Sequence, residues 1–330
     1  MSLSYTLALA LAAQGVEALI GYPAPLYRAF RHPVTWMGGW LTLLEAGLNR
    51  ANFGFAARRG LGALALILYL APVALAAEAL TRGLAPLGAL GFIILALAAA
   101  SLPAQRSLDS HVRTVADGLD ASLDEGRQAV AMIVGRNPNV LDGPGVARAA
   151  IESLAENFSD GIVAPLIWTA IGGLTGGALY KAINTADSMI GHQDERYAAF
   201  GWAAARLDDL INLPASRLAA LWLTIAAVVT PGASASEAAR AAWRDASRHR
   251  SPNAGWPEAA MAGALGLKLA GPRVYGETLI EDAFMGRGRR DAHAADIRRA
   301  LRLYRVACGL QASALAVTTA VLWSCRGRVL

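Results

Sequence analysis

Three stretches of the chain are apolar over about the length that a helix needs to cross a bilayer. They are Leu61–Leu80, Leu84–Leu102 and Val306–Trp323, and a spanning helix needs roughly 20 apolar residues. Leu3–Ile20 is equally long, and because it lacks the basic start of a signal peptide, we expect it to be retained. The sequence therefore predicts an all-α, polytopic helical integral membrane protein.

The charged residues lie mainly between these apolar stretches. Hydrophobic residues make up 55% of the chain and charged residues 17%, and a soluble protein would spread its charges along helix faces instead. Polar segments occupy Arg28–Arg59, Ala104–Asp160 and Pro231–Arg305. The first and last are rich in arginine and are expected to face the cytoplasm as sizeable helical loops. Thr81–Gly83 is then a short outer turn.

Two further apolar stretches, Gly161–Leu179 and Leu213–Val229, are interrupted by Gly, Pro or Arg. They could span the membrane, re-enter it or lie buried in protein. If both spanned it, the polar block at 184–192 would face outward, away from the other polar blocks. We therefore expect at least part of 161–230 to be re-entrant or buried, within a single membrane-embedded domain over residues 1–330.

Several classes of protein are disfavoured. The net charge of +5 comes from arginines that do not alternate with aromatic residues on one stretch, so no nucleic-acid partner is expected. The two cysteines, Cys308 and Cys325, form no disulfide framework or zinc spacing. No GxxxxGK[ST], HExxH, CxxC or GxSxG pattern occurs. The glycines of Gly172–Gly177 are interpreted as a helix-packing surface.

The first polar block combines Glu152, Glu156, Asn157 and Asp160. A helix places Glu152 and Glu156 on one face because they are four positions apart. Like charges at that spacing favour a shared cation, and carboxylate oxygens suit Mg²⁺. The alternative is a solvated helix face paired with arginines such as Arg148.

The second block contains Lys181, Asn184, Thr185 and Asp187 between apolar sequences. Lys181 is one of only two lysines, and its compact ammonium suits a phosphate or acyl-phosphate oxygen. A polar loop between helices is the alternative.

The third block brings Arg206, Asp208, Asp209 and Asn212 into an apolar stretch. Charges near a bilayer interior cost roughly 2.5–3.5 kcal/mol each on insertion scales, so they tend to be functional or paired. Asp208 and Asn212 could share a metal or a substrate phosphate, and an ion pair between Arg206 and either aspartate is the alternative.

The fourth block offers His249, Arg250, Ser251 and Asn253 on a backbone restricted by two prolines and a glycine. Its donors suit a carboxylate or phosphate. The alternative is a loop at the membrane surface anchored by Trp256.

These blocks, in this order, resemble the family of adenosylcobinamide-phosphate synthases (the CobD/CbiB type) over nearly the whole chain. The residues that carry the resemblance are His32-Pro33-Val34, Glu152–Asn157 with Asp160-Gly161, Asn184-Thr185 with Asp187–Met189 and Gly191, Ala205–Asp209, and His249–Glu258. Three positions depart from the family pattern: Glu17 replaces a common Asp, and Tyr22 and Arg287 stand where many members carry an acid.

The resemblance implies a ligase that forms a C–N amide bond. It implies that a propionate side chain of adenosylcobyric acid, a cobalt corrinoid, is condensed with (R)-1-amino-2-propanol phosphate or the free amino-alcohol. ATP and Mg²⁺ are the implied cofactors, with an acyl phosphate as the simplest activated carboxylate and no tightly bound prosthetic group. Catalysis would consist of positioning and charge neutralisation.

Residue chemistry and the resemblance together assign roles to individual side chains. The predicted catalytic residues are Glu156, Asp209 and Lys181. The predicted metal ligands are Glu152, Glu156, Asp160, Asp187 and Asp208. The predicted substrate-binding residues are His32, Asn157, Asn184, Thr185, Arg206, His249, Arg250, Ser251 and Asn253.

Two other functions stay open at this point, a membrane transporter and a non-catalytic corrinoid-binding membrane partner. Carboxylates inside membranes mark ion and substrate paths in many carriers, but no inverted repeat is visible in this sequence. The expected location is the cell inner (cytoplasmic) membrane, with the active site at the cytoplasmic side. Besides its substrates, the expected partners are membrane lipid and other membrane enzymes of cobalamin assembly.

Overall fold

The computed structural model describes residues 2–135, 137–271, 273–275, 278–280 and 282–326. The chain divides into two compact units. Unit 1 comprises Met1–Ala104, Ala164–Asn212 and Ala314–Leu330, and unit 2 comprises Gln105–Val163 and Leu213–Ser313. Each unit takes segments from distant parts of the sequence, and the single domain expected over 1–330 stays a prediction.

Unit 1 is built from helices that differ widely in length. They are α1 (Leu3–Ile20), α2 (Ala24–Phe30), α3 (Pro33–Leu48), α4 (Phe55–Leu84), α5 (Gly88–Ala99) and α9 (Ala164–Ile190), the 3₁₀ turn η1 (Ala85–Leu87), the start of α10 (Trp202–Val229) and the end of α13 (Ala294–Arg326).

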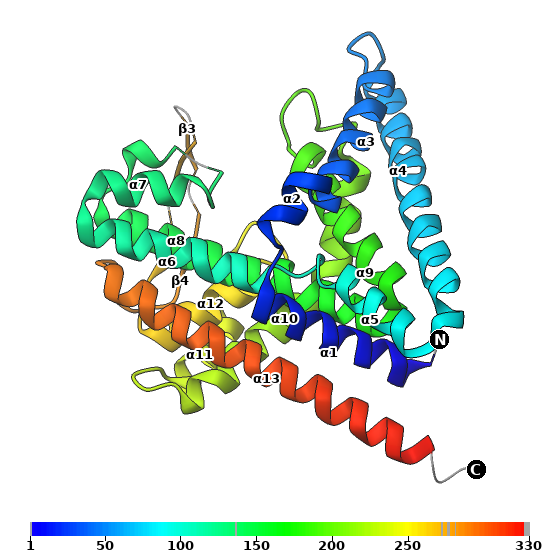
Figure 1. Cartoon of the computed structure of the whole chain (residues 1–330). Helices are drawn as coiled ribbons and strands as arrows, with labels where there is room; N and C mark the ends of the chain where they lie inside the picture. Colours follow the sequence, from blue (N-terminus) through cyan, green and yellow to red (C-terminus); the bar gives the residue numbers. More distant parts are fainter. Residues whose placement is uncertain (1, 136, 272, 276–277, 281, 327–330) are drawn as a thin grey trace. The chain divides into compact units, whose positions relative to one another are not determined.

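Helix α9 is the centre of unit 1, because α1, α3, α4 and α5 all pack against it (Figure 1). It is kinked at Gly173, whose φ of 63° and ψ of −154° interrupt the helix, a conformation that glycine adopts readily. An interruption disturbs the hydrogen bonds of the turn before it. Thr6 supplies a replacement donor there, since its hydroxyl donates to the carbonyl of Ala170 at 2.6 Å.

Small residues let the helices of unit 1 approach one another closely. One apolar cluster combines Leu9 and Ala13 of α1 with Leu95 and Ala99 of α5 and Leu174 of α9. A second cluster joins α3, α4, α9 and α10, and its largest members are Leu41, Leu66, Tyr69 and Phe200. Packing through alanine and glycine is typical of helices in membranes, where dispersion contacts replace the hydrophobic driving force.

Within the described residues, five stretches are long and apolar enough to cross a membrane. They are Leu3–Ile20, Phe55–Ala99, Gly143–Ile190, Trp202–Val229 and Ala294–Cys325. The predicted polytopic helical membrane protein is therefore confirmed, and helix α1 has the predicted bounds. The predicted stretch 306–323 lies inside α13.

The turn predicted at Thr81–Gly83 is wrong. Helix α4 continues through it to Leu84, because Thr81 is buried and Arg82 pairs with Glu78 one turn earlier at 2.7 Å. The chain turns instead at η1 and at Gly88, whose φ is 55°. Helix α5 therefore has 12 residues, or about 18 Å, and is shorter than the predicted span 84–102.

The two ambiguous apolar stretches are helical. Residues 161–179 lie in the candidate span Gly143–Ile190, and 213–229 lie in Trp202–Val229. The apolar window of Gly143–Ile190 is 61% buried, compared with 17% in Ala294–Cys325. Protein therefore covers Gly143–Ile190 far more than it covers Ala294–Cys325. We expected at least part of 161–230 to be re-entrant or buried, and its topology stays a prediction.

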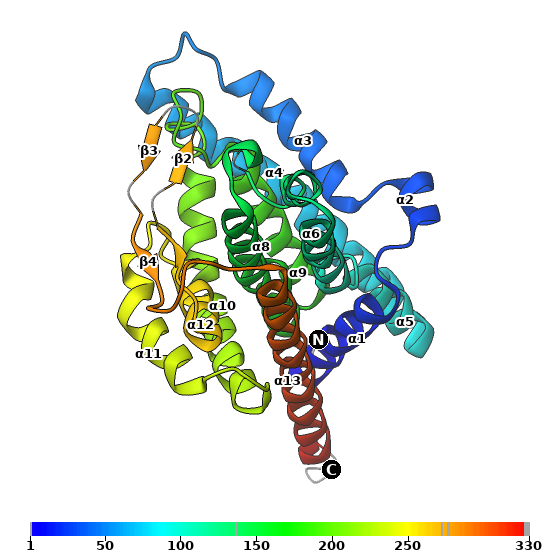
Figure 2. The same ribbon diagram turned by 90° about the vertical axis from the view of Figure 1, so that its left-hand side faces the viewer.

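Unit 2 contains shorter and more polar helices. They are α6 (Gln105–Ala121), α7 (Leu123–Ala131), α8 (Gly143–Phe158), α11 (Ala235–Asp245) and α12 (Gly255–Leu265), the 3₁₀ turns η2 (Pro138–Val140) and η4 (Ala246–Arg248), the π turn η3 (Ser159–Val163), the end of α10 and the start of α13. Helices α6 and α7 form one pair (Figure 1), and α11 and α12 form another (Figure 2).

Side-chain caps fix where the unit 2 helices begin. Ser122, Asp142 and Ser234 each accept a hydrogen bond from the backbone N–H three residues later, which satisfies one of the four unpaired donors at a helix start. Four strands follow α12 in the described part of the chain, namely β1 (Leu269–Ala270), β2 (Arg273–Tyr275), β3 (Thr278–Ile280) and β4 (Phe284–Met285), and they pair as β1–β4 and β2–β3. They are too short to alter the all-α class.

Candidate functional site: two groups of polar residues

The second predicted block is helical, because α9 continues to Ile190. The alternative of a polar loop is therefore wrong. Thr185 is buried and donates its hydroxyl to the carbonyl of Lys181 at 2.7 Å. Asn184 and Asp187 are half-buried on neighbouring turns of the helix. Apolar contacts on the rest of α9 hold this polar face in place.

Hydrogen bonds connect the polar face of α9 to the start of α10. Asp208 is buried, and its carboxylate accepts from the amides of Asn184 at 3.4 Å and Asn212 at 2.9 Å. The oxygen of Asn212 accepts in turn from the hydroxyl of Tyr180 at 2.9 Å. This chain of bonds orders Asp208 in a buried environment, where a satisfied polar network is rigid.

Three acids of this network lie close enough to repel one another. The carboxylate of Asp208 interacts electrostatically with those of Asp187 and Asp209, and Arg206 lies within electrostatic reach of Asp187. Arg206 also pairs with Asp209 at 3.1 Å, so the ion pair weighed as an alternative is present. His192 also lies within electrostatic reach of Asp187, so three carboxylates outnumber the two basic side chains Arg206 and His192, an arrangement that favours a cation.

Gly191 makes room for one of these carboxylates. It follows α9, and a Cβ atom at this position would overlap the Oδ1 atom of Asp187. A side chain here would therefore displace the carboxylate. This close approach gives a physical reason why a glycine stands four residues after Asp187 in the sequence.

Two residues predicted from separate blocks, His32 and Lys181, lie near each other in unit 1. His32 precedes α3, where its Nδ1 atom accepts from the N–H of Val34 at 3.3 Å. Its ring also hydrogen-bonds the backbone of Ser101. Burial and the charge of Lys181 lower the pKa of His32, so the ring is neutral at pH 7.

The first predicted block lies in unit 2, at the point where α8 passes into the π turn η3. Glu156 and Asn157 are exposed and Asp160 is half-buried. Glu152 is only 5% exposed, and its Oε1 atom accepts from the N–H of Ala270 at 2.8 Å. π turns frequently occur at functional sites, and this one contains Asp160.

The predicted metal ligands fall into both units. Glu152, Glu156 and Asp160 belong to unit 2, and Asp187 and Asp208 belong to unit 1. Among the residues that the structure describes, no group of three or more His, Cys, Asp or Glu is arranged to hold a metal ion. The residues of unit 1 nevertheless fit Mg²⁺, which typically needs one or two carboxylates and takes its other ligands from water and phosphate.

The fourth predicted block forms a turn that its own side chains stabilise. The hydroxyl of Ser251 accepts from the N–H groups of Asn253 and Ala254, both at 3.2 Å, and Nδ1 of His249 accepts from the N–H of Ser251 at 3.0 Å. Buried Asn253 accepts through Oδ1 from Ser216. The observed contacts of these side chains hold the turn, and their predicted role in substrate binding is untested.

The other members of this block differ in their surroundings. Arg250 is exposed. Nε2 of His249 lies 3.8 Å from Oε1 of Glu258, which is 2% exposed on α12. Trp256 contacts the guanidinium of Arg217 at 4.9 Å, so its ring packs on a cation in unit 2. Arg250 therefore has the most accessible donors of the block.

The sequence reasoning missed a buried acid, Asp245, at the end of α11. Arg244 bonds its carboxylate through two nitrogens at 2.8 and 2.5 Å, and the N–H of Gly286 donates to it at 3.0 Å. Burial alone would raise the pKa of Asp245, but these bonds outweigh it and lower that pKa. An acid at a helix C-terminus is disfavoured by the helix dipole, which is the signal that could have identified it.

Gly286 and Gly288 belong to the Gly-Arg-Gly sequence noted above as a departure from the family pattern. Gly286 has a φ of 79°, and a Cβ atom there would meet the carbonyl of Leu267. Arg287 is exposed beside them. The conformation of Gly286 directs its N–H to Asp245, so this glycine has a structural role even though residue 287 is not acidic.

The fold and these groups define a polytopic helical membrane protein with ordered acids at the ends of apolar helices. Residues 10–304 match the family described as CobD/Cbib protein. The chain belongs to this family, and its role is in cobalamin biosynthesis.

Relatives with similar sequences cover nearly the whole chain. A protein named "Cobalamin biosynthesis protein CobD" from Sinorhizobium fredii is 50% identical over 92% of this chain and 93% of its own length. Proteins of the same name from Rhodobacter capsulatus and Brucella suis are 47% and 46% identical, over 96% and 88% of this chain and 98% and 89% of their own lengths. No solved structure matches the chain.

Proposed function

We propose that the chain is an ATP-dependent ligase that joins adenosylcobyric acid to (R)-1-amino-2-propanol phosphate, or to the free amino-alcohol. The product is adenosylcobinamide phosphate or adenosylcobinamide. Membership of the CobD/Cbib family supports a role in cobalamin biosynthesis. The observation that carries the chemistry is the ordered set of carboxylates around Asp208, which suits the Mg²⁺ that accompanies ATP.

A carboxylate anion resists attack by an amine, so the propionate has to be activated first. In the proposed reaction its oxygen takes the terminal phosphoryl group of ATP, which releases ADP. The neutral amine then attacks the acyl carbon, phosphate leaves, and the amine gives up a proton. Such chemistry needs positioning and charge neutralisation more than covalent help from the protein.

In unit 1, Asp187 and Asp208 are proposed to hold Mg²⁺. When bound, the ion would neutralise charge on phosphate oxygens. Lys181, with its compact ammonium, is proposed to neutralise a further phosphate oxygen. Neutral His32 can donate or accept a hydrogen bond near Lys181. Asn184 and Thr185 are proposed to contact substrate from α9.

A base has to take the proton from the incoming ammonium. We propose Asp209, whose carboxylate is oriented by its ion pair with Arg206, or Glu156, which is exposed beside the π turn. Asn157 and Arg250 are the accessible binding groups proposed in unit 2. His249, Ser251 and Asn253 are proposed to present Arg250 through the turn that they stabilise.

The proposed location is the cell inner membrane, with the site on the cytoplasmic side. It rests on the arginine-rich segments 28–59 and 231–305. Other membrane enzymes of cobalamin assembly are the proposed protein partners.

The test uses the purified full chain in vesicles with adenosylcobyric acid, amino-alcohol phosphate, ATP and Mg²⁺. Mass spectrometry of an amide product that requires every component supports the proposal. Counterflow of corrinoid without product would identify a transporter, and corrinoid binding without product or transport would identify a non-catalytic partner. Either result overturns the ligase assignment.

A further inference from the structure

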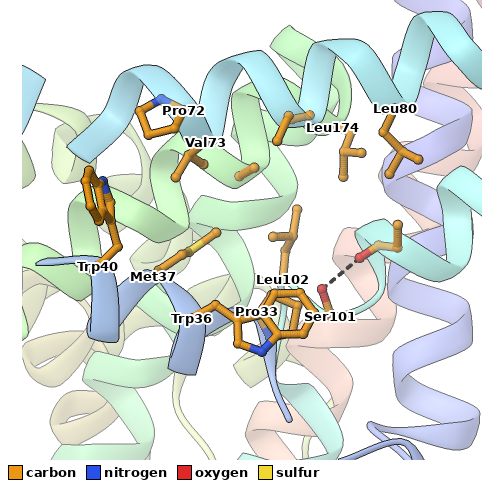
Figure 3. Close-up of a pocket in the computed structure, with 14 residues that line it drawn as sticks. Pro33, Trp36, Met37, Trp40, Pro72, Val73, Leu80, Ser101, Leu102 and Leu174 are labelled. Atoms are coloured by element: carbon orange, nitrogen blue, oxygen red, sulfur yellow. Dashed lines mark hydrogen bonds between the residues drawn. The ribbon is translucent and has the colours of Figure 1, made fainter. Parts of the chain in front are cut away.

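An open cavity of about 570 Å³ lies in unit 1 between α3, α4, α5 and α9. Figure 3 shows Trp36 and Met37 of α3 on one side and Pro72 and Val73 of α4 on the other. The volume is within the range of roughly 300–1,000 Å³ that is usual for ligand pockets. The cavity is therefore large enough for a molecule rather than for a few waters.

The lining of this cavity is almost wholly apolar. Apart from Trp36, Trp40 and Ser101, its side chains carry only carbon or sulfur beyond the backbone. The hydroxyl of Ser101 donates to the carbonyl of Ala98 at 2.8 Å (Figure 3), and the indole of Trp40 donates to that of Leu68 at 3.2 Å. The donors of Ser101 and Trp40 are therefore engaged within the protein, and a ligand that is apolar along most of its length fits the cavity.

The cavity opens along the part of the protein most suited to contact lipid. Helices α4 and α5 form the candidate span Phe55–Ala99, which has the highest mean hydropathy of the five, 2.1, and is only 28% buried. The lining residues Trp36, Ala76 and Leu80 are themselves exposed. The cavity therefore opens on a face of unit 1 whose composition suits contact with bilayer hydrocarbon.

Polar residues adjoin one end of the cavity. Pro33 and Ser101 line it, Arg31 and His32 directly precede Pro33 in the chain, and the ring of His32 hydrogen-bonds the backbone of Ser101. Arg31 is exposed, and the tryptophans at 36 and 40 are of the kind that concentrates at membrane interfaces. An arginine at the interface suits the phosphate of an anionic lipid.

We propose that this cavity binds an acyl chain of an anionic membrane phospholipid, with the head group beside Arg31. An acyl chain has no polar group to satisfy, so it matches the lining along its length. An extended peptide would bring backbone N–H and C=O groups against walls that are almost wholly apolar, which is costly in an apolar environment.

The test compares two matched variants of α4 in the full chain. Ala76 lines the cavity and Ala79 does not, although both are exposed alanines of the same helix. Each protein is placed in vesicles of phosphatidylcholine with phosphatidylglycerol that carries a photoactivatable diazirine on its acyl chain. In the native protein and in Ala79→Phe, peptides of α3 and α4 that line the cavity should take up most of the label. In Ala76→Phe this labelling should be lost.

Equal labelling of the two variants, or a label spread evenly over α1, α4, α5 and α13, would overturn the proposal. So would dimers cross-linked through α3, because a second copy would then occupy the cavity. Thermal unfolding confirms that each variant is folded, and Ala76→Leu replaces Ala76→Phe if the larger side chain prevents folding.

A third variant tests the proposed position of the head group. Arg31→Gln should remove the preference of the site for phosphatidylglycerol over diazirine-labelled phosphatidylcholine. An unchanged preference would contradict the placement of the head group beside Arg31.

Discussion

The indole nitrogen of Trp40 donates a hydrogen bond to the backbone carbonyl of Leu68, at 3.2 Å. This carbonyl is the acceptor that residue 72 would normally use, but residue 72 is Pro72 and has no N–H. Proline inside a membrane helix is tolerated where a neighbouring helix satisfies the carbonyl that it leaves unpaired. Trp40 of α3 does so for α4.

This relationship predicts an energetic coupling between Trp40 and Pro72. Trp40→Phe should lower the free energy of unfolding by about 0.5–1.5 kcal/mol, the usual contribution of one hydrogen bond. In a Pro72→Ala background the loss should be smaller, because the backbone N–H gained by this substitution can itself donate to Leu68. Denaturant titration of the four proteins of the double-mutant cycle measures the difference, and equal losses in both backgrounds would refute the coupling.

The two candidate bases are expected to be essential for turnover. Glu156→Gln and Asp209→Asn should each lower kcat by at least about a hundredfold, as for loss of a general base or an electrostatic group. A general base should also remove the acid limb of the pH–rate profile, whereas a metal ligand should leave the pH optimum unchanged. Glu125→Gln, at an exposed acid of α7, serves as the control. Near-normal kcat in both correctly inserted variants would show the assignment to be wrong.

A divalent cation should be required for activity, and Asp208 should set its affinity. Treatment with EDTA should abolish turnover and added Mg²⁺ should restore it. Asp208→Asn should raise the Mg²⁺ concentration for half-maximal activity by roughly tenfold or more, the scale on which well-placed groups affect metal sites. Undiminished activity after removal of all metal would exclude the proposed role of the carboxylates.

Gly191→Ala tests whether the position of the Asp187 carboxylate is important. The new methyl group overlaps this carboxylate and also comes within 2.6 Å of the backbone carbonyl of Asp187, so Asp187 has to move and kcat should fall on the order of a hundredfold, as a displacement of about 1 Å can cause. The control is Gly172→Ala, because a Cβ at Gly172 contacts nothing within 4 Å. If the two variants show the same kcat, Asp187 does not act at this position.

Asp245 should stabilise unit 2 in a pH-dependent way. Its carboxylate accepts from Arg244 and Gly286, and its pKa is lower in the folded protein. The stabilisation is therefore complete above the ordinary aspartate pKa of about 3.9 and is lost as the pH falls through the lower folded-state value.

Asp245→Asn should accordingly cost about 1.5–3 kcal/mol at neutral pH, the range for hydrogen bonds to charged groups. Thermal unfolding followed from neutral pH down to about pH 3 should show the two Tm curves converging in acid. A constant gap between the curves would mean that the charge of Asp245 does not stabilise the fold.

Helix type and membrane class could be predicted because hydropathy and length report them directly. The bounds of α1 were predicted correctly, since its apolar run ends at Gly21, whose φ is 68°. The bounds of α4 were not. Arg58 and Arg82 lie inside this helix and bond to Asn49 and Glu78, so their charges extend the helix beyond its apolar run.

The candidate site could be predicted only within each helix. The spacing of Asp208 and Asn212 indicated a shared face, and the structure joins them directly. The contact of Asp208 with Asn184 depends on how α10 packs beside α9, which no local spacing reports. Asp245 was missed for the same reason, because its partner Gly286 lies 41 residues further along the chain.

The bond between Thr6 of α1 and Ala170 of α9 joins residues that are 164 positions apart. Ribosomes add roughly 5–20 residues per second, so α1 is made some 8–33 s before the helix against which it packs. During that interval α1, which carries Glu17, a residue buried in the finished protein, lacks its packing against α9. Biogenesis of this protein therefore has to keep α1 in a provisional environment, such as the insertion machinery or the membrane surface, until α9 has been synthesised.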